Sequence, residues 1–83
     1  MDRANDTAYG LAGGVISKDM SKIFAVTRNL KAGTIWVNNY ATVMPEAEFG
    51  GVKQSGFGRE GGVTALSEWT NLKTVFMKVP NIL

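Results

Sequence analysis

The sequence predicts an α/β fold of at most one domain, in which a strand–helix–strand unit is followed by a glycine-rich loop. Its 83 residues are the length of a single small domain. The composition is 45% hydrophobic and 19% charged, which is typical of a globular chain rather than a disordered one. Over residues 12–38, two short apolar segments flank one amphipathic segment with short links, as in a βαβ unit.

The two apolar segments are predicted to be strands. Residues 12–17 form a short run with β-branched side chains, although two glycines weaken the strand pattern. Residues 34–38 are β-branched, aromatic and mostly apolar on both faces, which indicates a buried strand with Trp36 in the core. Because a helix connects them, the two strands should lie parallel, with a right-handed crossover.

The segment between the strands is predicted to be a helix over residues 19–30. Its apolar residues recur at helical spacing, and they are Met20, Ile23, Phe24 and Leu30. Asp19 or Ser17 can serve as the N-cap, because either side chain can accept a hydrogen bond from a free N–H group at the helix start. Gly33 is expected to stop the helix in a left-handed conformation.

The second half of the chain reads as a loop, a short helix and a strand. Residues 39–62 contain six glycines and Pro45 with little periodicity, and a loop of this length is usually functional or part of something larger. A short helix should run from about residue 62 to Trp69. From Leu72 to Val79 both faces are partly apolar, which predicts a strand that is covered on two sides.

Composition excludes several classes of function. The chain has no cysteine and no histidine, so a Ser-His-Asp triad, a thiol nucleophile and a Cys or His metal site are ruled out. A net charge of +2 is small for a nucleic-acid-binding domain, and no nucleic-acid partner is expected. No export signal and no membrane span are visible, so the expected location is cytoplasmic, with no membrane partner.

Three patterns in the loop are interpreted as non-functional. Residues 56–61 match G-x-G-x-x-G, but the strand that should precede a dinucleotide site and the acidic residue that should follow it are missing. Residues 51–56 begin like a P-loop but lack the Lys-Ser/Thr pair that contacts phosphate and magnesium. Glu46 and Glu48 are interpreted as solvated loop residues rather than as an acid–base pair.

A fourth pattern concerns binding rather than catalysis. Lys53, Phe57 and Arg59 interleave basic and aromatic side chains, which could stack single-stranded nucleic acid. No basic face elsewhere supports that interpretation.

The glycine-rich loop and its neighbours resemble a known family. Residues 48–60, Glu-Phe-Gly-Gly-Val-Lys-Gln-Ser-Gly-Phe-Gly-Arg-Glu, strongly resemble the Pro-Phe-Gly-Gly-x-Lys-x-Ser-Gly-x-Gly-Arg-Glu motif near the C-terminus of aldehyde dehydrogenases. Residues 4–12, 32–38 and 70–75 also look like segments of that family, in the same order. The resemblance is nearest to the betaine-aldehyde and general non-acylating branch. The motif and structural residues that carry it are Gly33, Asn38, Gly50, Gly51, Lys53, Ser55, Gly56, Gly58, Arg59 and Glu60.

The resemblance implies that the chain is the C-terminal fragment of an NAD(P)-dependent aldehyde dehydrogenase, which oxidises aldehydes to carboxylic acids. Residues 1–40 would be a βαβ piece of the catalytic domain and residues 41–62 the substrate-funnel loop. Residues 63–83 would form the terminal helix and the oligomerisation strand. Such a piece is an incomplete fold when isolated.

Within this picture Phe49 would line the substrate funnel, with Gly33 and Asn38 holding the turn and strand end behind it. Residues 40–48 would form the variable loop that shapes aldehyde specificity. The strand from Leu72 to Val79 would pair with a neighbouring subunit of the parent, or with a second copy of this chain.

The resemblance places the catalytic cysteine, the general base and the cofactor site N-terminal to this region. No catalytic, cofactor-binding or metal residue is therefore assigned to this chain. It is expected to be inactive alone, to bind no cofactor, and to meet NAD or NADP and an aldehyde only within a full-length parent.

Two residues depart from the family pattern. Glu48 stands where the family usually has proline, which adds a charge and removes a rigid φ angle at the funnel mouth. Asn71 stands where an acidic residue often sits, so an ion-pair partner for Arg59 is lost. The alternative interpretation is a free-standing small interaction module that derives from the family and catalyses nothing.

Overall fold

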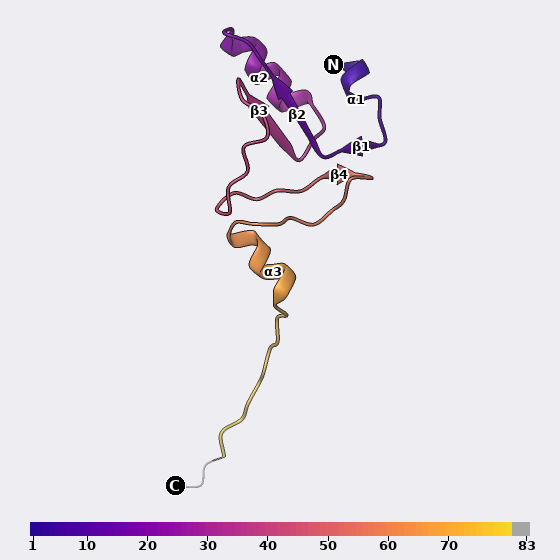
Figure 1. Ribbon diagram of the computed structural model, residues 1–83. Helices are drawn as coiled ribbons and strands as arrows, with labels where there is room; N and C mark the ends of the chain where they lie inside the picture. The colour runs from indigo at the N-terminus through magenta and orange to yellow at the C-terminus, as the bar shows by residue number, and fades with distance from the viewer. Residues whose placement is uncertain (81–83) are drawn as a thin grey trace.

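A parallel pair of strands lies at the centre of the structure, a computed structural model that describes residues 1–80. Strand β2 (Ala12–Val15) pairs with β3 (Thr34–Val37), with Ala12 opposite Thr34 and Val15 opposite Val37. Helix α2 (Met20–Asn29) connects them and lies alongside the pair (Figure 1). The predicted parallel strand–helix–strand unit is confirmed, although both strands end earlier than predicted.

The start of α2 is set by a side-chain cap. The Oδ1 atom of Asp19 accepts hydrogen bonds from the N–H groups of Ser21 at 2.9 Å and Lys22 at 3.3 Å. The first N–H groups of a helix have no partner within the helix, so this cap satisfies two of them. Asp19 is therefore the N-cap, while the Ser17 hydroxyl accepts a bond from the Asp19 N–H at 3.0 Å.

The end of α2 differs from the prediction. Leu30 is the C-cap in an extended conformation, with φ −77° and ψ 122°. The Asn5 side chain donates to the Asn29 carbonyl and accepts from the Lys31 N–H, both at 2.8 Å, and so closes the helix end. Gly33 is not among the glycines with positive φ. The prediction that a left-handed Gly33 stops the helix is therefore wrong.

Gly33 instead allows two backbone segments to approach closely. A Cβ atom at residue 33 would clash with the carbonyl oxygen of Gly50. The Gly33 N–H donates to the Gly10 carbonyl at 3.1 Å and to the Leu11 carbonyl at 3.2 Å. Residue 33 thus lies between the N-terminal segment and the glycine-rich loop, and packs the loop against the start of β3.

A second, unpredicted pair of strands ties the loop to the N-terminal segment. The chain begins with α1 (Asp2–Asn5), and β1 (Tyr9–Gly10) then pairs antiparallel with β4 (Val52–Lys53). Each strand has two residues, which is too short to show a hydrophobic period. The predicted loop is therefore partly ordered by pairing, which its sequence pattern did not reveal.

The chain ends in a short helical segment and an extended stretch. The 3-10 turn η1 (Val63–Ala65) leads into α3 (Leu66–Trp69), which confirms the predicted helix with a tighter first turn. Residues 70–80 then run away from the folded part (Figure 1). Residues 81–83, assigned above to this segment, lie outside the described residues.

The predicted strand from Leu72 to Val79 is not formed within the described chain. A strand needs a neighbour that completes its hydrogen bonds, and residues 70–80 have none in the described part of the chain. Its pairing with another chain stays a prediction.

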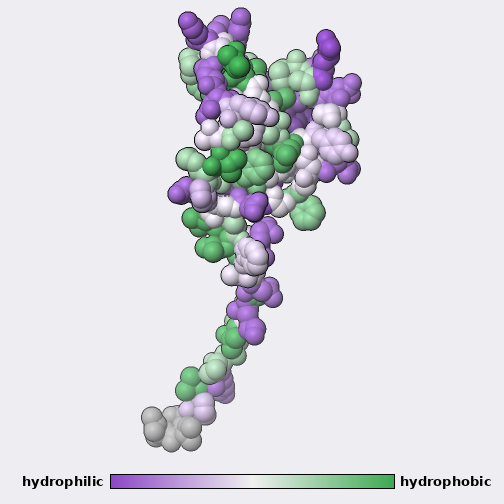
Figure 2. Space-filling view, in the orientation of Figure 1, coloured by the Kyte–Doolittle hydropathy of each residue, from purple (hydrophilic) through white to green (hydrophobic). Residues whose placement is uncertain are grey.

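The folded part buries little apolar surface. Among the described residues, Ile23 is the buried hydrophobic side chain, at 4% exposure. Trp36, predicted to be in the core, is only half-buried, and its Nε1 donates to the Thr42 carbonyl at 2.9 Å. Figure 2 shows hydrophobic residues on the surface and along the extended end. The radius of gyration is 20.0 Å, against about 12 Å for a compact chain of this length. The expected incomplete fold is confirmed.

The Gly33 contact generates a prediction. Gly33→Ala should destabilise the chain by about 1–3 kcal/mol, because the new methyl group forces the Gly50 backbone to move. Gly14→Ala is the control, since its Cβ would lie 3.5 Å from the Trp36 carbonyl oxygen, an ordinary contact. Urea denaturation followed by circular dichroism should show the larger loss for Gly33→Ala. Equal losses would contradict the close packing.

Candidate functional site

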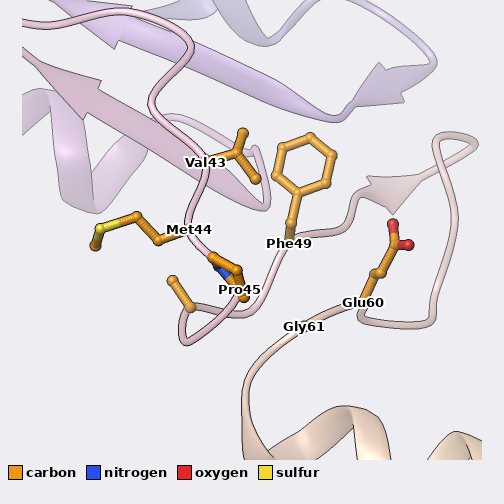
Figure 3. Close-up of a pocket in the computed structure, with 7 residues that line it drawn as sticks. Val43, Met44, Pro45, Phe49, Glu60 and Gly61 are labelled. Carbon is orange, nitrogen blue, oxygen red and sulfur yellow. The ribbon is translucent and has the colours of Figure 1, made fainter.

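An open cleft of about 440 Å³ lies between two arms of the glycine-rich loop. Most of its lining is apolar, and Glu60 is the one ionisable side chain in it. In Figure 3 the Phe49 ring lies beside Val43, while the Glu60 carboxylate extends from the opposite arm. The lining residues are Val43, Met44, Pro45, Ala47, Phe49, Glu60 and Gly61.

Three backbone hydrogen bonds join the two arms. Phe49 and Glu60 exchange both of their backbone bonds, each with an N···O distance of 2.7 Å. The Gly62 N–H donates to the Pro45 carbonyl at 2.8 Å. These bonds place Phe49 at the edge of the cleft and bring Glu60 next to it, so the structure unites two of the residues singled out from the sequence.

A side-chain hydrogen bond adds to these three. The Thr64 hydroxyl donates to Oε1 of Glu48 at 2.7 Å. This bond lowers the pKa of the Glu48 carboxyl from its usual value of 4.5, because it stabilises the ionised form. Glu48 is exposed, as expected of a loop residue, but it is not simply solvated. Sequence reasoning missed Thr64 altogether.

Arg59 and the paired glycines hold the turn behind the cleft. The Arg59 guanidinium donates to the carbonyls of Gly51 and Gly58, both at 2.9 Å. A Cβ atom at Gly50 would clash with the Gly58 carbonyl oxygen, and one at Gly51 would clash with the Ser55 side chain. The glycines therefore permit close packing of the turn, and Arg59 closes it.

Lys53 and Ser55 tie the loop to the N-terminal segment. The Ser55 hydroxyl accepts a hydrogen bond of 2.9 Å from the buried Gly10 N–H. The Lys53 ammonium donates to the carbonyls of Asn5 at 3.0 Å and Thr7 at 3.1 Å. Neither side chain lines the cleft. Both side chains hold the loop in place against the N-terminal segment.

Asn38 joins the ends of β2 and β3. Its side chain accepts from the Ser17 N–H and donates to the Ser17 carbonyl, both at 2.9 Å. Its φ of +52° lies in the left-handed region, which asparagine tolerates better than most residues. The two bonds thus join the end of β3 to Ser17, which follows β2.

The G-x-G-x-x-G pattern at residues 56–61 does not fit a dinucleotide. A cofactor cradle needs a full strand before the glycines and a helix whose N-terminus faces the pyrophosphate. Here β4 has two residues and α3 has four. A Cβ atom at Gly58 would lie 3.6 Å from the Glu68 carboxylate, an anion that would repel phosphate. No cofactor chemistry is therefore assigned to residues 56–61.

The described part of the chain has neither a metal-binding cluster nor a membrane-spanning helix. Residues 1–80 contain no group of three or more His, Cys, Asp or Glu side chains that could hold a metal ion. Within the same range, none of the helices has the length and apolar character needed to cross a bilayer.

Comparison with known proteins gives consistent matches. The model of the aldehyde dehydrogenase family matches residues 1–75. Aldehyde dehydrogenase, cytosolic 1, of Rattus norvegicus is 52% identical over 77 residues, which are 93% of this chain and 15% of the relative. Betaine aldehyde dehydrogenase of Brucella anthropi is 45% identical over 80 residues, which are 96% of this chain and 16% of the relative.

The fold also matches a solved structure. An aldehyde dehydrogenase from Bacillus cereus, solved as its NAD+ complex, superposes with a TM-score of 0.86 at 44% identity. The superposition covers 95% of this chain and 16% of that one. This chain therefore spans only about 15–16% of the length of the relatives it matches.

The hydrogen bond between Ser55 and Gly10 leads to a second prediction. Ser55→Ala should destabilise the loop by about 1–3 kcal/mol, because the buried Gly10 N–H loses its acceptor. Ser21→Ala is the control, because Ser21 takes part in the helix cap through its backbone N–H, which alanine keeps. Hydrogen exchange of the Gly10 amide should accelerate in Ser55→Ala alone. An unchanged rate would show that water replaces the hydroxyl without cost.

Proposed function

The chain belongs to the aldehyde dehydrogenase family, and we propose that it is the C-terminal part of an oxidoreductase that oxidises aldehydes to carboxylic acids with NAD or NADP. In this proposal residues 1–40 belong to the catalytic domain. The cleft at Phe49 forms part of the substrate funnel, and the extended C-terminal stretch belongs to a subunit interface. Relatives named as cytosolic and as betaine aldehyde dehydrogenases support an aldehyde as the substrate class.

The apolar cleft around Phe49 is the observation that carries this proposal. Substrate sites are concave and mostly apolar, with a few polar groups that fix orientation. The cleft has an aromatic ring and aliphatic side chains along its wall, and a single carboxylate from Glu60. Such a wall can bind the hydrocarbon part of an aldehyde, while it offers no thiol nucleophile.

The reacting groups would come from elsewhere in a longer parent. Oxidation of an aldehyde through a covalent thiol intermediate needs a cysteine, and this chain has none. Hydride transfer needs a nicotinamide cofactor, and residues 56–61 do not fit its phosphates. The proposed contribution of this chain is therefore binding and shape rather than chemistry.

A chimaera tests the proposal. The chain would replace the matching segment of the rat cytosolic relative, and aldehyde oxidation would be followed with NAD+ and NADP+ in turn. The chimaera should turn over, whereas the isolated chain should not exceed the uncatalysed background. Phe49→Ala in the chimaera should lower kcat/KM roughly tenfold, the usual effect of removing a few apolar groups from a substrate pocket.

Phe57→Ala provides the matched control for that experiment. Phe57 is an aromatic residue of the same loop, but it is fully exposed and does not line the cleft. Its replacement should leave kcat/KM close to that of the unmodified chimaera. A folded chimaera in which both variants behave alike would contradict the assignment of Phe49 to the funnel.

For the extended C-terminal stretch we propose pairing with a second chain. Its large apolar side chains are exposed, with Leu72 at 98% and Phe76 at 95%. An unpaired extended segment presents free N–H and C=O groups that recruit another strand. In the parent the partner would be a neighbouring subunit. In the isolated chain it would be a second copy.

Sedimentation velocity tests the pairing. At roughly 100 μM, where weak association becomes visible, the unmodified chain should contain dimers or larger species. Val75→Lys should raise the monomer fraction, because an unpaired charge is costly to bury in an interface. Thr74→Lys adds the same charge at a polar neighbour and should have a smaller effect. An unmodified chain that sediments only as a monomer would refute the pairing.

A further inference from the structure

We propose that Glu48 is a positioning residue which, through Thr64, holds the cleft arm that carries Phe49 against the terminal helical segment. The inference rests on the proposed function for what the cleft binds, whereas the contact itself belongs to this chain. Glu48 directly precedes Phe49, and Thr64 lies in η1, 16 residues further along. The bond between them therefore connects two separate parts of the structure.

Between residues 43–49 and residues 60–64, this is the one described hydrogen bond that joins two side chains. The exchange between Phe49 and Glu60 and the bond from Gly62 to Pro45 use backbone atoms alone. Backbone bonds persist with almost any side chain, and these three set the spacing of the two arms at Phe49–Glu60 and at Pro45–Gly62. The bond of 2.7 Å from the Thr64 hydroxyl to Glu48 depends on these two side chains.

The backbone next to the bond leaves room for the Glu48 side chain. A Cβ atom at Gly62 would lie 2.6 Å from Cδ and 2.7 Å from Oε1 of Glu48, a distance that real atoms do not tolerate. Gly62 also has a φ of +63°, which favours glycine. The Glu48 carboxylate therefore lies directly over a glycine, and a larger residue there would displace it from Thr64.

The bond to Thr64 also compensates for the absence of a proline at residue 48. A proline before Phe49 would fix its own φ angle and stiffen the arm. Glutamate leaves that angle free, so an arm with glutamate is less rigid at residue 48 than an arm with proline. A hydrogen bond to an ionised carboxylate is stronger than one between neutral groups, and the ionised form is the one that Thr64 favours. The tether to η1 that this bond makes supplies a constraint in place of the proline.

The hydrogen bond between Glu48 and Thr64 bears on the shape of the ligand that the cleft can accept. Pro45, Ala47 and Phe49 line the wall that the tether holds, and Glu60 and Gly61 line the facing wall. The terminal helical segment begins directly after the facing wall. The Glu48–Thr64 bond ties the arm that carries Phe49 to the segment that follows the facing wall, so it adds to the three backbone bonds that set the width of the cleft.

Three variants of the full 83-residue chain test the proposal by NMR. Thr64→Val removes the hydroxyl while keeping the shape of the side chain, and Thr64→Ser restores the hydroxyl. Glu46→Gln is the matched control, a neighbouring glutamate in the same arm that does not line the cleft. Two quantities are measured: the exchange rates of the Phe49 and Gly62 amides, and the titration of the Glu48 side-chain carboxyl carbon.

Thr64→Val should accelerate exchange of both amides roughly fivefold, the change expected for one net hydrogen bond. It should also move the pKa of Glu48 upward, towards 4.5. Thr64→Ser should restore both quantities, and Glu46→Gln should change neither. The titration reports the bond itself, which a merely structural role for Thr64 would not move.

Three results would overturn the proposal. Unchanged amide exchange in Thr64→Val, with a changed Glu48 titration, would show a bond that positions nothing. An unchanged titration would show that the bond is not formed. Exchange of the Phe49 and Gly62 amides at unfolded-chain rates in the unmodified chain would show that no arm is held. No aldehyde or cofactor enters these measurements, so their failure leaves the proposed function standing, and the chimaera can fail without affecting them.

Discussion

The close contact between the backbones of Gly33 and Gly50 is the constraint on which the rest of the structure depends. Gly33 lies between α2 and β3, and Gly50 directly follows Phe49. A Cβ atom at residue 33 would clash with the Gly50 carbonyl oxygen, so the glycine-rich loop can rest on the start of β3 only because residue 33 is glycine. This contact fixes the cleft relative to the strand–helix–strand unit, together with the hydrogen bond from Nε1 of Trp36 in β3 to the carbonyl of Thr42, the residue before the cleft-lining Val43.

The cleft is held by polar links rather than by a core. Ser55 and Lys53 fasten one side of the loop to the N-terminal segment, and Arg59 closes the turn. Glu48 fastens the other side to η1. Each link is worth little when water can replace it. With Ile23 as the buried hydrophobic side chain of the described residues, the arrangement gains little from apolar burial. The proposed longer parent would supply the missing cover for the exposed side chains.

The residues that resemble the aldehyde dehydrogenase motif have three different structural roles. The glycines and Arg59 shape the turn, Lys53 and Ser55 anchor it, and Phe49 and Glu60 face the cleft. The G-x-G-x-x-G pattern at residues 56–61, which resembles a phosphate-binding loop, thus contributes to backbone packing. Glu48, the departure from the motif, has a partner of its own in Thr64.

The sequence by itself determined the elements that local order encodes. The helix over α2 and its Asp19 cap, the parallel strands and the short terminal helix all follow from residues near one another in the chain. The motif also singled out Phe49, which lines the cleft. Only the tertiary structure decided the contacts between distant segments. The pairing of β1 with β4 has too few residues for a period. The role of Gly33 depends on a carbonyl far along the chain rather than on a left-handed turn, and the partner of Glu48 lies 16 residues away. The stretch from Leu72 to Val79 has the composition of a strand but no neighbour in the described chain. The periodicity of apolar residues indicates which side chains prefer burial. A strand, or a link such as the bond between Glu48 and Thr64, exists only where a second segment completes its hydrogen bonds.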